Sequence, residues 1–149
     1  MDEITLPDAI EPNEWFIVFH PKARTRWISW LACGKFKHVS AFAYCPGFRV
    51  WLIYDAQWSG MRLFLVSAAA AKAMLGKYTA CCAIVKFTPW RHPMPLTSRL
   101  AYYCVPAIKH LLGVRCASWR PDGLYVHLLR NGGQLIDGRH VDTINPGRS

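Results

Sequence analysis

Acidic residues are scarce in this chain, and long apolar runs are missing from it. The 149 residues include 9 Asp and Glu against 18 Lys and Arg, a formal net charge of +9 at pH 7. The longest weakly charged run, Met61 to Phe87, is interrupted by Arg62, Lys72 and Lys77, so no stretch offers the roughly 18 apolar residues that a membrane-spanning helix needs. The beginning of the chain, MDEITLPDAIEPNEW, is acidic and polar, unlike a signal peptide. We therefore expect neither a membrane span nor an export signal.

Closely spaced cysteine pairs of the C-x2-C type are also missing. The chain has 6 cysteines, at positions 33, 45, 81, 82, 104 and 116. Zinc sites usually take their ligands from such pairs, and adjacent Cys81 and Cys82 would point to opposite faces of the strand predicted there. Without an export signal, a disulfide framework is not expected either. The cysteine pattern thus predicts no metal and no cofactor.

Basic residues are scattered along the chain and do not form blocks. No run of five or six like charges occurs, and there is no helix-turn-helix or RNA-binding signature. The positive charge would attract polyanions in general, such as anionic wall polymers, nucleic acid or lipid headgroups. We expect a generally basic surface without a specific nucleic-acid site.

The order of apolar segments predicts one α+β domain, with an antiparallel sheet packed against helices. Residues 1–13 read as an arm, 15–133 as the core and 134–149 as a polar tail. The pattern predicts strands over 15–20, 38–44, 48–54, 61–66 and 78–87, and helices over 67–76, about 104–113 and 121–133. The turn Cys45-Pro46-Gly47 joins the second and third strands, and Ser67 and Gly76 bound the first helix.

The segment YYCVPAIKHLLG (102–113) predicts a helix that begins at about Cys104. Pro106 lacks an N–H and fits only the first turn, while the apolar residues after it recur at helical spacing and Gly113 offers a stop. The unpaired N–H groups and the dipole at a helix N-terminus favour a cysteine thiolate. Cys104 is therefore a candidate nucleophile, and a small packed core residue is the competing interpretation.

His38 opens the first strand of the predicted hairpin and is the candidate base. A histidine beside a cysteine at a helix N-terminus is what thiol catalysis requires, and a third polar group should hold the imidazole ring. Counting across the predicted turn places His38 opposite Tyr54 or its neighbour, so Tyr54, Asp55 and Gln57 lie within reach. Asp55 is the first choice because a carboxylate both orients the ring and stabilises imidazolium. The competing interpretation of Asp55 is a residue that only forms a turn. Gln57 is the second choice for the third position.

The remaining histidines are interpreted as surface or packing residues: His20, His92, His110, His127 and His140. Aromatic side chains that would line a substrate groove are Trp51, Trp58 and Trp90, with core packing the favoured interpretation for Trp51.

The order of these segments resembles the circularly permuted branch of the papain-like thiol hydrolases, relatives of NlpC-type cell-wall peptidases. A histidine strand (KHVSAFAY) and a polar residue after the next strand (VWLIYDAQW) precede a cysteine that opens a helix (YYCVPAIKHLLG). The resemblance covers residues 15 to about 114 and carries the family roles to His38 and Cys104. Val-Pro after the cysteine departs from the small polar residues common there, and the third position does not align cleanly.

The resemblance implies a permuted papain-like fold and a thiol protease or amidase whose substrate is bacterial cell-wall peptide (peptidoglycan). A small basic protein of this kind would suit a bacteriophage, as a virion protein or in the host cytoplasm. The alternative is a non-catalytic structural or adaptor protein of a phage particle, which keeps the fold and binds other phage proteins through its basic, aromatic-rich surface.

Overall fold

The computed structural model describes residues 12–22, 34–57, 60–89 and 103–137. These residues are α+β, with a six-stranded antiparallel sheet and three helices, as the sequence predicted. In chain order the elements are β1 (Trp15–His20), β2 (His38–Cys45), β3 (Val50–Gln57), β4 (Gly60–Val66), α2 (Ala68–Cys81), β5 (Ala83–Phe87), α3 (Cys104–Leu112), α4 (Pro121–Arg130) and β6 (Gln134–Ile136).

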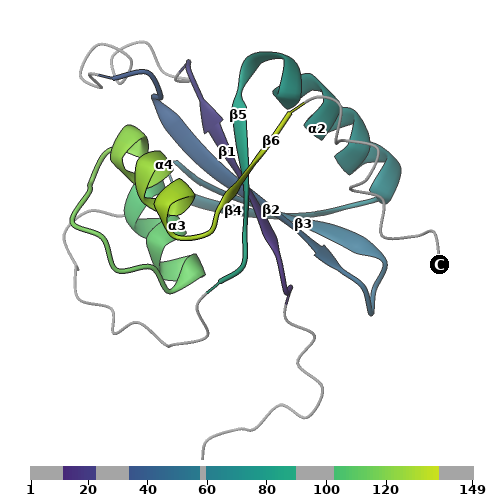
Figure 1. The fold of residues 1–149 in the computed structure, drawn as a ribbon. Helices are drawn as coiled ribbons and strands as arrows, with labels where there is room; N and C mark the ends of the chain where they lie inside the picture. Colours follow the sequence, from purple (N-terminus) through teal and green to yellow (C-terminus); the bar gives the residue numbers. More distant parts are fainter. Residues whose placement is uncertain (1–11, 23–33, 58–59, 90–102, 138–149) are drawn as a thin grey trace, which may run out of the picture.

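The strand β1 lies inside the sheet, whose order is β4-β3-β2-β1-β5-β6. Its residues Trp15 to Phe19 are all buried, on both faces of the sheet. This follows from a continuous apolar sequence, because a strand without polar alternation must be covered on both sides. Figure 1 shows how this is achieved: α2 covers one face of the sheet, and α3 and α4 lie together on the other.

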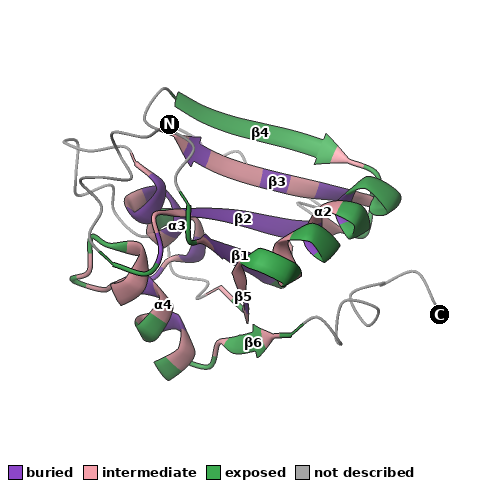
Figure 2. Ribbon diagram, turned by 90° about the horizontal axis from the view of Figure 1, so that it is seen from above, coloured by how far each residue is buried: buried purple, intermediate pink, exposed green. Residues whose placement is uncertain are grey.

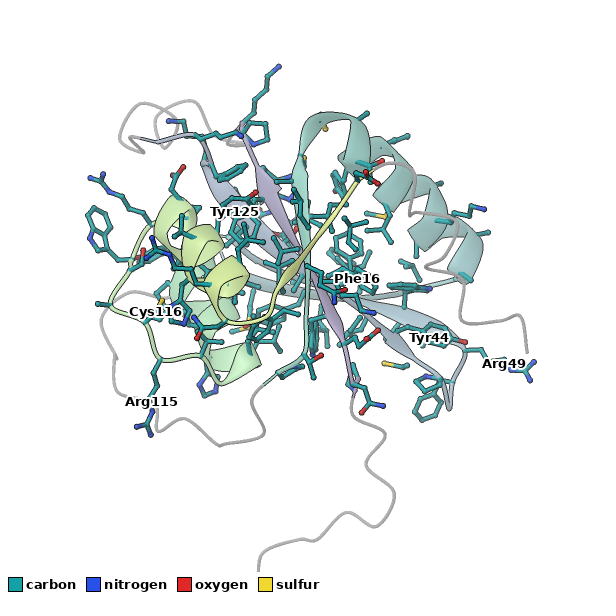
Figure 3. All side chains as sticks on the ribbon, viewed as in Figure 1. Phe16, Tyr44, Arg49, Arg115, Cys116 and Tyr125 are labelled. Carbon is teal, nitrogen blue, oxygen red and sulfur yellow. The ribbon has the colours of Figure 1, made fainter. Side chains whose placement is uncertain are left out.

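Two buried clusters fill the space between the sheet and its helices. On the α2 face, Phe16, Phe42 and Trp51 pack with Leu75 of the helix, so the core role favoured for Trp51 is confirmed. On the other face, the cluster takes residues from β1, β2, β5, α3 and α4. Tyr125 points from α4 toward the sheet (Figure 3), and its ring contacts Phe19 at 5.2 Å between centroids.

The edge strand β4 is exposed along most of its length (Figure 2). Among the residues that the structure describes, β4 pairs only with β3. The large apolar side chains Met61, Leu63, Phe64 and Leu65 are 45–67% exposed. Charged residues, prolines and bulges normally protect such an edge, and here Arg62 is the only charged residue of the strand.

The hairpin between β2 and β3 differs from the expected one in its loop and its register. Strand β2 ends at Cys45 and β3 begins at Val50, so the loop has four residues, 46–49. Cys45 pairs with Val50 and Ala41 with Tyr54, whereas the predicted three-residue turn would have paired Phe42 with Val50. The left-handed position of the loop is Arg49, with φ 52°, and not Gly47. The residues Cys45-Pro46-Gly47 correctly indicated a turn, but they did not determine how many residues the loop between β2 and β3 contains.

The helix α2 is longer than expected, and the following strand is correspondingly shorter. Ser67 caps the N-terminus as predicted, its side chain accepting from the Ala70 N–H. However, Gly76 does not end the helix, which continues to Cys81, and the strand predicted over 78–87 occupies only Ala83–Phe87. A glycine inside a helix costs about 1 kcal/mol, which packing of the helix against the sheet overcomes.

The start of the predicted polar tail forms a sixth strand. Residues Gln134–Ile136 form this strand and pair with β5. The sequence of these three residues did not predict a strand. The helix α4 ends at Arg130, two residues before the first of the paired glycines that were expected to stop it. The remaining predicted arm (1–11) and tail (138–149), together with Trp58, Trp90 and His92, lie outside the described residues.

The helix α3 begins at Cys104 and ends at Leu112, as predicted. Gly113 takes the left-handed conformation, with φ 63°, and its N–H bonds back to the last turn. In the part of the chain that the structure describes, no helix combines the length and the apolar character needed to cross a bilayer.

We expect Leu112→Ala to lower the free energy of unfolding by about 2–5 kcal/mol, because it leaves a cavity in a fully buried site. The matched control is Leu63→Ala on β4, where the side chain is 63% exposed; its effect should stay within about 0.5 kcal/mol. Urea unfolding followed by tryptophan fluorescence measures both. Equal effects of the two changes would contradict the assignment of α3 to the core.

Candidate functional site

The His38 ring is held by a carboxylate from the neighbouring strand. His38 is the first residue of β2 and Asp55 lies near the end of β3, and the His38 Nε2–Asp55 Oδ1 distance is 2.7 Å. The β2–β3 pairing ends at Ala41 and Tyr54, so Asp55 follows the last paired residue of β3 and His38 lies three residues before Ala41. The contact joins the two strands beyond their last pair, and it brings together two of the three predicted site residues.

Of the two alternatives for the third position, Gln57 supports Asp55 and Tyr54 points elsewhere. The Gln57 Nε2 group donates to Asp55 Oδ2 at 2.6 Å, so both carboxylate oxygens are engaged and the orientation of the carboxylate is fixed. The Tyr54 hydroxyl donates to the Met61 Sδ atom at 2.8 Å. Tyr54 packs against the cluster beneath α3 and α4.

The segment before His38 is anchored to α4. The Asp122 Oδ1 atom accepts from the backbone N–H groups of Lys35 at 2.9 Å and Phe36 at 3.3 Å. Gly34 has φ 124°, and a Cβ atom there would lie 2.2 Å from Asp122 Oδ2. A glycine is thus required where this loop meets the carboxylate, and the anchored loop fixes the start of β2.

Cys104 is the first residue of α3, and its hydrogen bond and charge contribute to the raised pKa of His38. The helix packs against β2 and β3, and Cys104 belongs to the cluster on that side, where it is 8% exposed. The His38 and Asp55 side chains are 23% and 17% exposed, so solvent reaches the group from their side.

The surroundings of His38 favour its charged form. Burial lowers its pKa, but the hydrogen bonds and charges of Asp55 and Cys104 outweigh burial and raise the pKa to about 9. For Asp55, burial opposes ionisation, and the hydrogen bonds from His38 and Gln57 lower its pKa overall. A pKa of about 9 favours the protonated form of His38 at neutral pH, beside the Asp55 carboxylate.

A second histidine, His20, lies beside His38 although the sequence indicated only a surface or packing role. The β1–β2 register pairs His20 with His38, and their ring centroids are 5.4 Å apart. His20 Nε2 lies 2.8 Å from the Oγ atom of buried Ser40. Burial and the charge of His38 lower the pKa of His20 to about 4. Only the pairing of β1 with β2, which joins residues 18 apart, could have revealed this neighbour.

No cluster of three or more potential metal ligands occurs among the described residues. The donors around His38 are one carboxylate, one thiol and a second imidazole that is engaged by Ser40. This arrangement can activate a thiol by holding an imidazolium beside it.

No family model matches the chain, and no curated protein or solved structure matches it either. The function is therefore inferred from the geometry of these side chains.

We expect NMR titration of the histidine rings to find His38 changing protonation near pH 9 and His20 near pH 4. Asp55→Asn should lower the pKa of His38, because it removes the charge and weakens the hydrogen bond while burial remains. The control His110→Gln, on an exposed position of α3, should leave both values unchanged. A pKa of His38 that does not respond to Asp55→Asn would contradict the pairing.

The same shifts set the sign of the pH dependence of stability. The folded state holds the His38 proton more tightly than the unfolded chain, so this stabilisation is complete below about pH 6.5 and is lost as pH rises through about 9. His20 has the opposite sign: its contribution is present above about pH 6.5 and is lost as pH falls through about 4.

Proposed function

We propose that the protein is a thiol-dependent amidase or peptidase in which Cys104 is the nucleophile, His38 the general acid and base, and Asp55 the residue that orients His38. The observation that supports this proposal is the 2.7 Å contact between His38 Nε2 and Asp55 Oδ1, together with the hydrogen bond and charge by which Cys104 raises the pKa of His38. Gln57 completes the set by holding the carboxylate.

In the proposed reaction the Cys104 sulfur attacks the carbonyl carbon of an amide, and the negative charge moves to the carbonyl oxygen. The backbone N–H of Cys104, in the unpaired first turn of α3, is placed to donate to that oxygen. The His38 imidazolium then protonates the leaving amine as the C–N bond breaks, which leaves a thioester. Neutral His38 next removes a proton from water, which attacks the thioester; the C–S bond breaks, the acid is released, and Cys104 returns as a thiolate beside the His38 imidazolium.

The raised pKa of His38 fits the first half of this cycle. A histidine with a pKa of about 9 is protonated at neutral pH. The proton that the leaving amine needs is already on the ring before the thiolate attacks. Asp55 maintains this state through its short contact with Nε2.

For the substrate we propose bacterial cell-wall peptide, and for the chain architecture a permuted papain-like arrangement. Both follow from the resemblance of the histidine strand, the polar residue and the later cysteine helix to the NlpC-type peptidases. The net charge of +9 would also draw the protein toward anionic wall polymers. A bacteriophage setting, in the virion or in the host cytoplasm, suits a small basic enzyme of this type.

We expect Cys104→Ala and His38→Ala each to abolish hydrolysis of peptidoglycan fragments and simple peptide esters. Combining the two changes should cause little further loss, because residues that act as one unit lose most of their benefit at the first deletion. Asp55→Asn should cost less than either, since nucleophile and base remain. Product release followed by chromatography, with melting temperatures for every variant, measures these effects.

The matched control is Cys45→Ala, at the far end of β2, which removes a half-buried thiol outside the site. It should retain activity close to that of the unaltered protein. Equal hydrolysis by the unaltered protein and Cys104→Ala would exclude the thiol mechanism.

A non-catalytic adaptor is the second candidate function, and the exposed edge of β4 favours it. An edge strand with free backbone groups and exposed apolar side chains can accept an extended strand from a partner protein. In a phage particle that partner would be another structural protein.

If the adaptor function holds, Leu63→Lys on β4 should weaken binding to that partner protein about tenfold or more, because it places a charge on the apolar edge. Cys104→Ala should leave that binding unchanged. Pull-down of purified phage structural proteins, quantified by titration, distinguishes the two variants. If hydrolysis depends on Cys104 and partner binding does not respond to Leu63→Lys, the adaptor function is contradicted and only the enzyme function remains.

A further inference from the structure

The C-terminal turn of α2 brings two adjacent thiols into contact. Cys81 is the last residue of the helix, Cys82 is its C-cap, and their Sγ atoms are 3.4 Å apart. The sequence-based interpretation, in which the two side chains point to opposite faces of a strand, is wrong because the helix extends to Cys81. The Cys81 Sγ atom also donates to the Lys77 carbonyl at 3.4 Å, which holds it on the helix.

The two thiols differ in exposure. Cys81 is exposed, whereas Cys82 is partly buried between the helix end and the sheet. Burial and the hydrogen bond with Cys81 raise the pKa of Cys82 to about 12. A dissolved oxidant therefore meets Cys81 first, while Cys82 remains a protonated thiol within reach of the sulfur that has reacted.

Cys82 also contacts the histidine next to the candidate site. Its Sγ atom lies 3.5 Å from His20 Nδ1. His20 Nε2 in turn lies 2.8 Å from Ser40 Oγ. The Cys82 thiol thus contacts a ring that is packed against the His38 ring.

We propose that Cys81 and Cys82 are a redox-active dithiol, which a peroxide oxidises to a disulfide between the adjacent residues, and that this oxidation releases His20 from Cys82. An exposed cysteine beside a resolving cysteine is the arrangement on which reversible thiol oxidation depends.

The reaction proceeds in two balanced steps. The Cys81 thiolate attacks one peroxide oxygen, the O–O bond breaks, and the departing hydroxide takes up a proton, leaving Cys81 as a sulfenic acid. The Cys82 sulfur then attacks the Cys81 sulfur; the S–S bond forms, the S–O bond breaks, and the Cys82 proton leaves with the hydroxyl as a second water. The two sulfurs together lose two electrons, which reduce hydrogen peroxide to water.

Disulfide formation must change the backbone at the end of α2. Adjacent Cα atoms are about 3.8 Å apart, below the roughly 4.4–6.8 Å that disulfides usually span. The last turn of the helix therefore has to rearrange, and the contact of the Cys82 thiol with His20 is lost. A strained disulfide of this kind is readily reduced by an added thiol, so the change is reversible.

The experiment uses the full chain carrying Cys104→Ala, which removes the nucleophile of the proposed function and makes the two outcomes independent. The reduced protein is treated with an equimolar amount of hydrogen peroxide, and the remaining free thiols are alkylated. Digestion with trypsin then releases the peptide YTACCAIVK (78–86), which contains both cysteines. We expect this peptide to become lighter by two hydrogens, and its free thiols to disappear about tenfold faster than that of Cys45.

The matched control is Cys82→Ser, in which Cys81 should stop at the sulfenic acid or oxidise further. In the oxidised protein the NMR signals of the His20 ring should move and then return with dithiothreitol; in the control they should not follow this cycle. Free thiols persisting in YTACCAIVK, or a disulfide joining Cys81 to another chain, would overturn the dithiol assignment. A disulfide that leaves the His20 signals unmoved would overturn the link to His20.

Discussion

The burial of β1 on both of its faces is the constraint from which the rest of the arrangement follows. Five successive apolar residues, Trp15 to Phe19, have no polar side, so the strand is stable only inside a sheet covered by helices on both faces. β2 and β5 flank it, α2 covers one face, and α3 with α4 covers the other. His20 ends this strand, which is why a histidine lies half-buried at the end of the core.

Two strand registers then assemble the polar group around His38. The β1–β2 register sets His20 beside His38, and the β2–β3 register brings Asp55 onto the same face. A slip of one residue in the second register would turn Asp55 to the opposite face of the sheet and remove the carboxylate from the ring. The four-residue loop 46–49 and the burial of Phe42 and Ile53 against α2 fix that register, so packing of the apolar core determines the electrostatics of the site.

Features with a local cause could be predicted from the sequence, and those that depend on distant partners could not. Pro106 and Gly113 bound α3 by backbone chemistry alone, so the position of Cys104 was correctly predicted. Gly76 misled the prediction, because a helix supported by a sheet tolerates a glycine. The short strand β6 exists only through its pairing with β5. Asp55 was selected from three candidates by its chemistry, although the loop length used in the count was wrong. His20 was missed because its neighbour His38 comes from another strand.

The two imidazoles also explain why one histidine of the pair carries the charge. Protonating both rings, 5.4 Å apart, would place like charges together in a partly buried site. Asp55 offers His38 a full negative charge at 2.7 Å, whereas Ser40 and the protonated Cys82 offer His20 only neutral partners. The proton therefore stays on His38, and His20 remains neutral. Replacing the neutral partners of His20 by a carboxylate would divide the charge between the two rings, because a negative charge beside His20 would favour its protonated form as well.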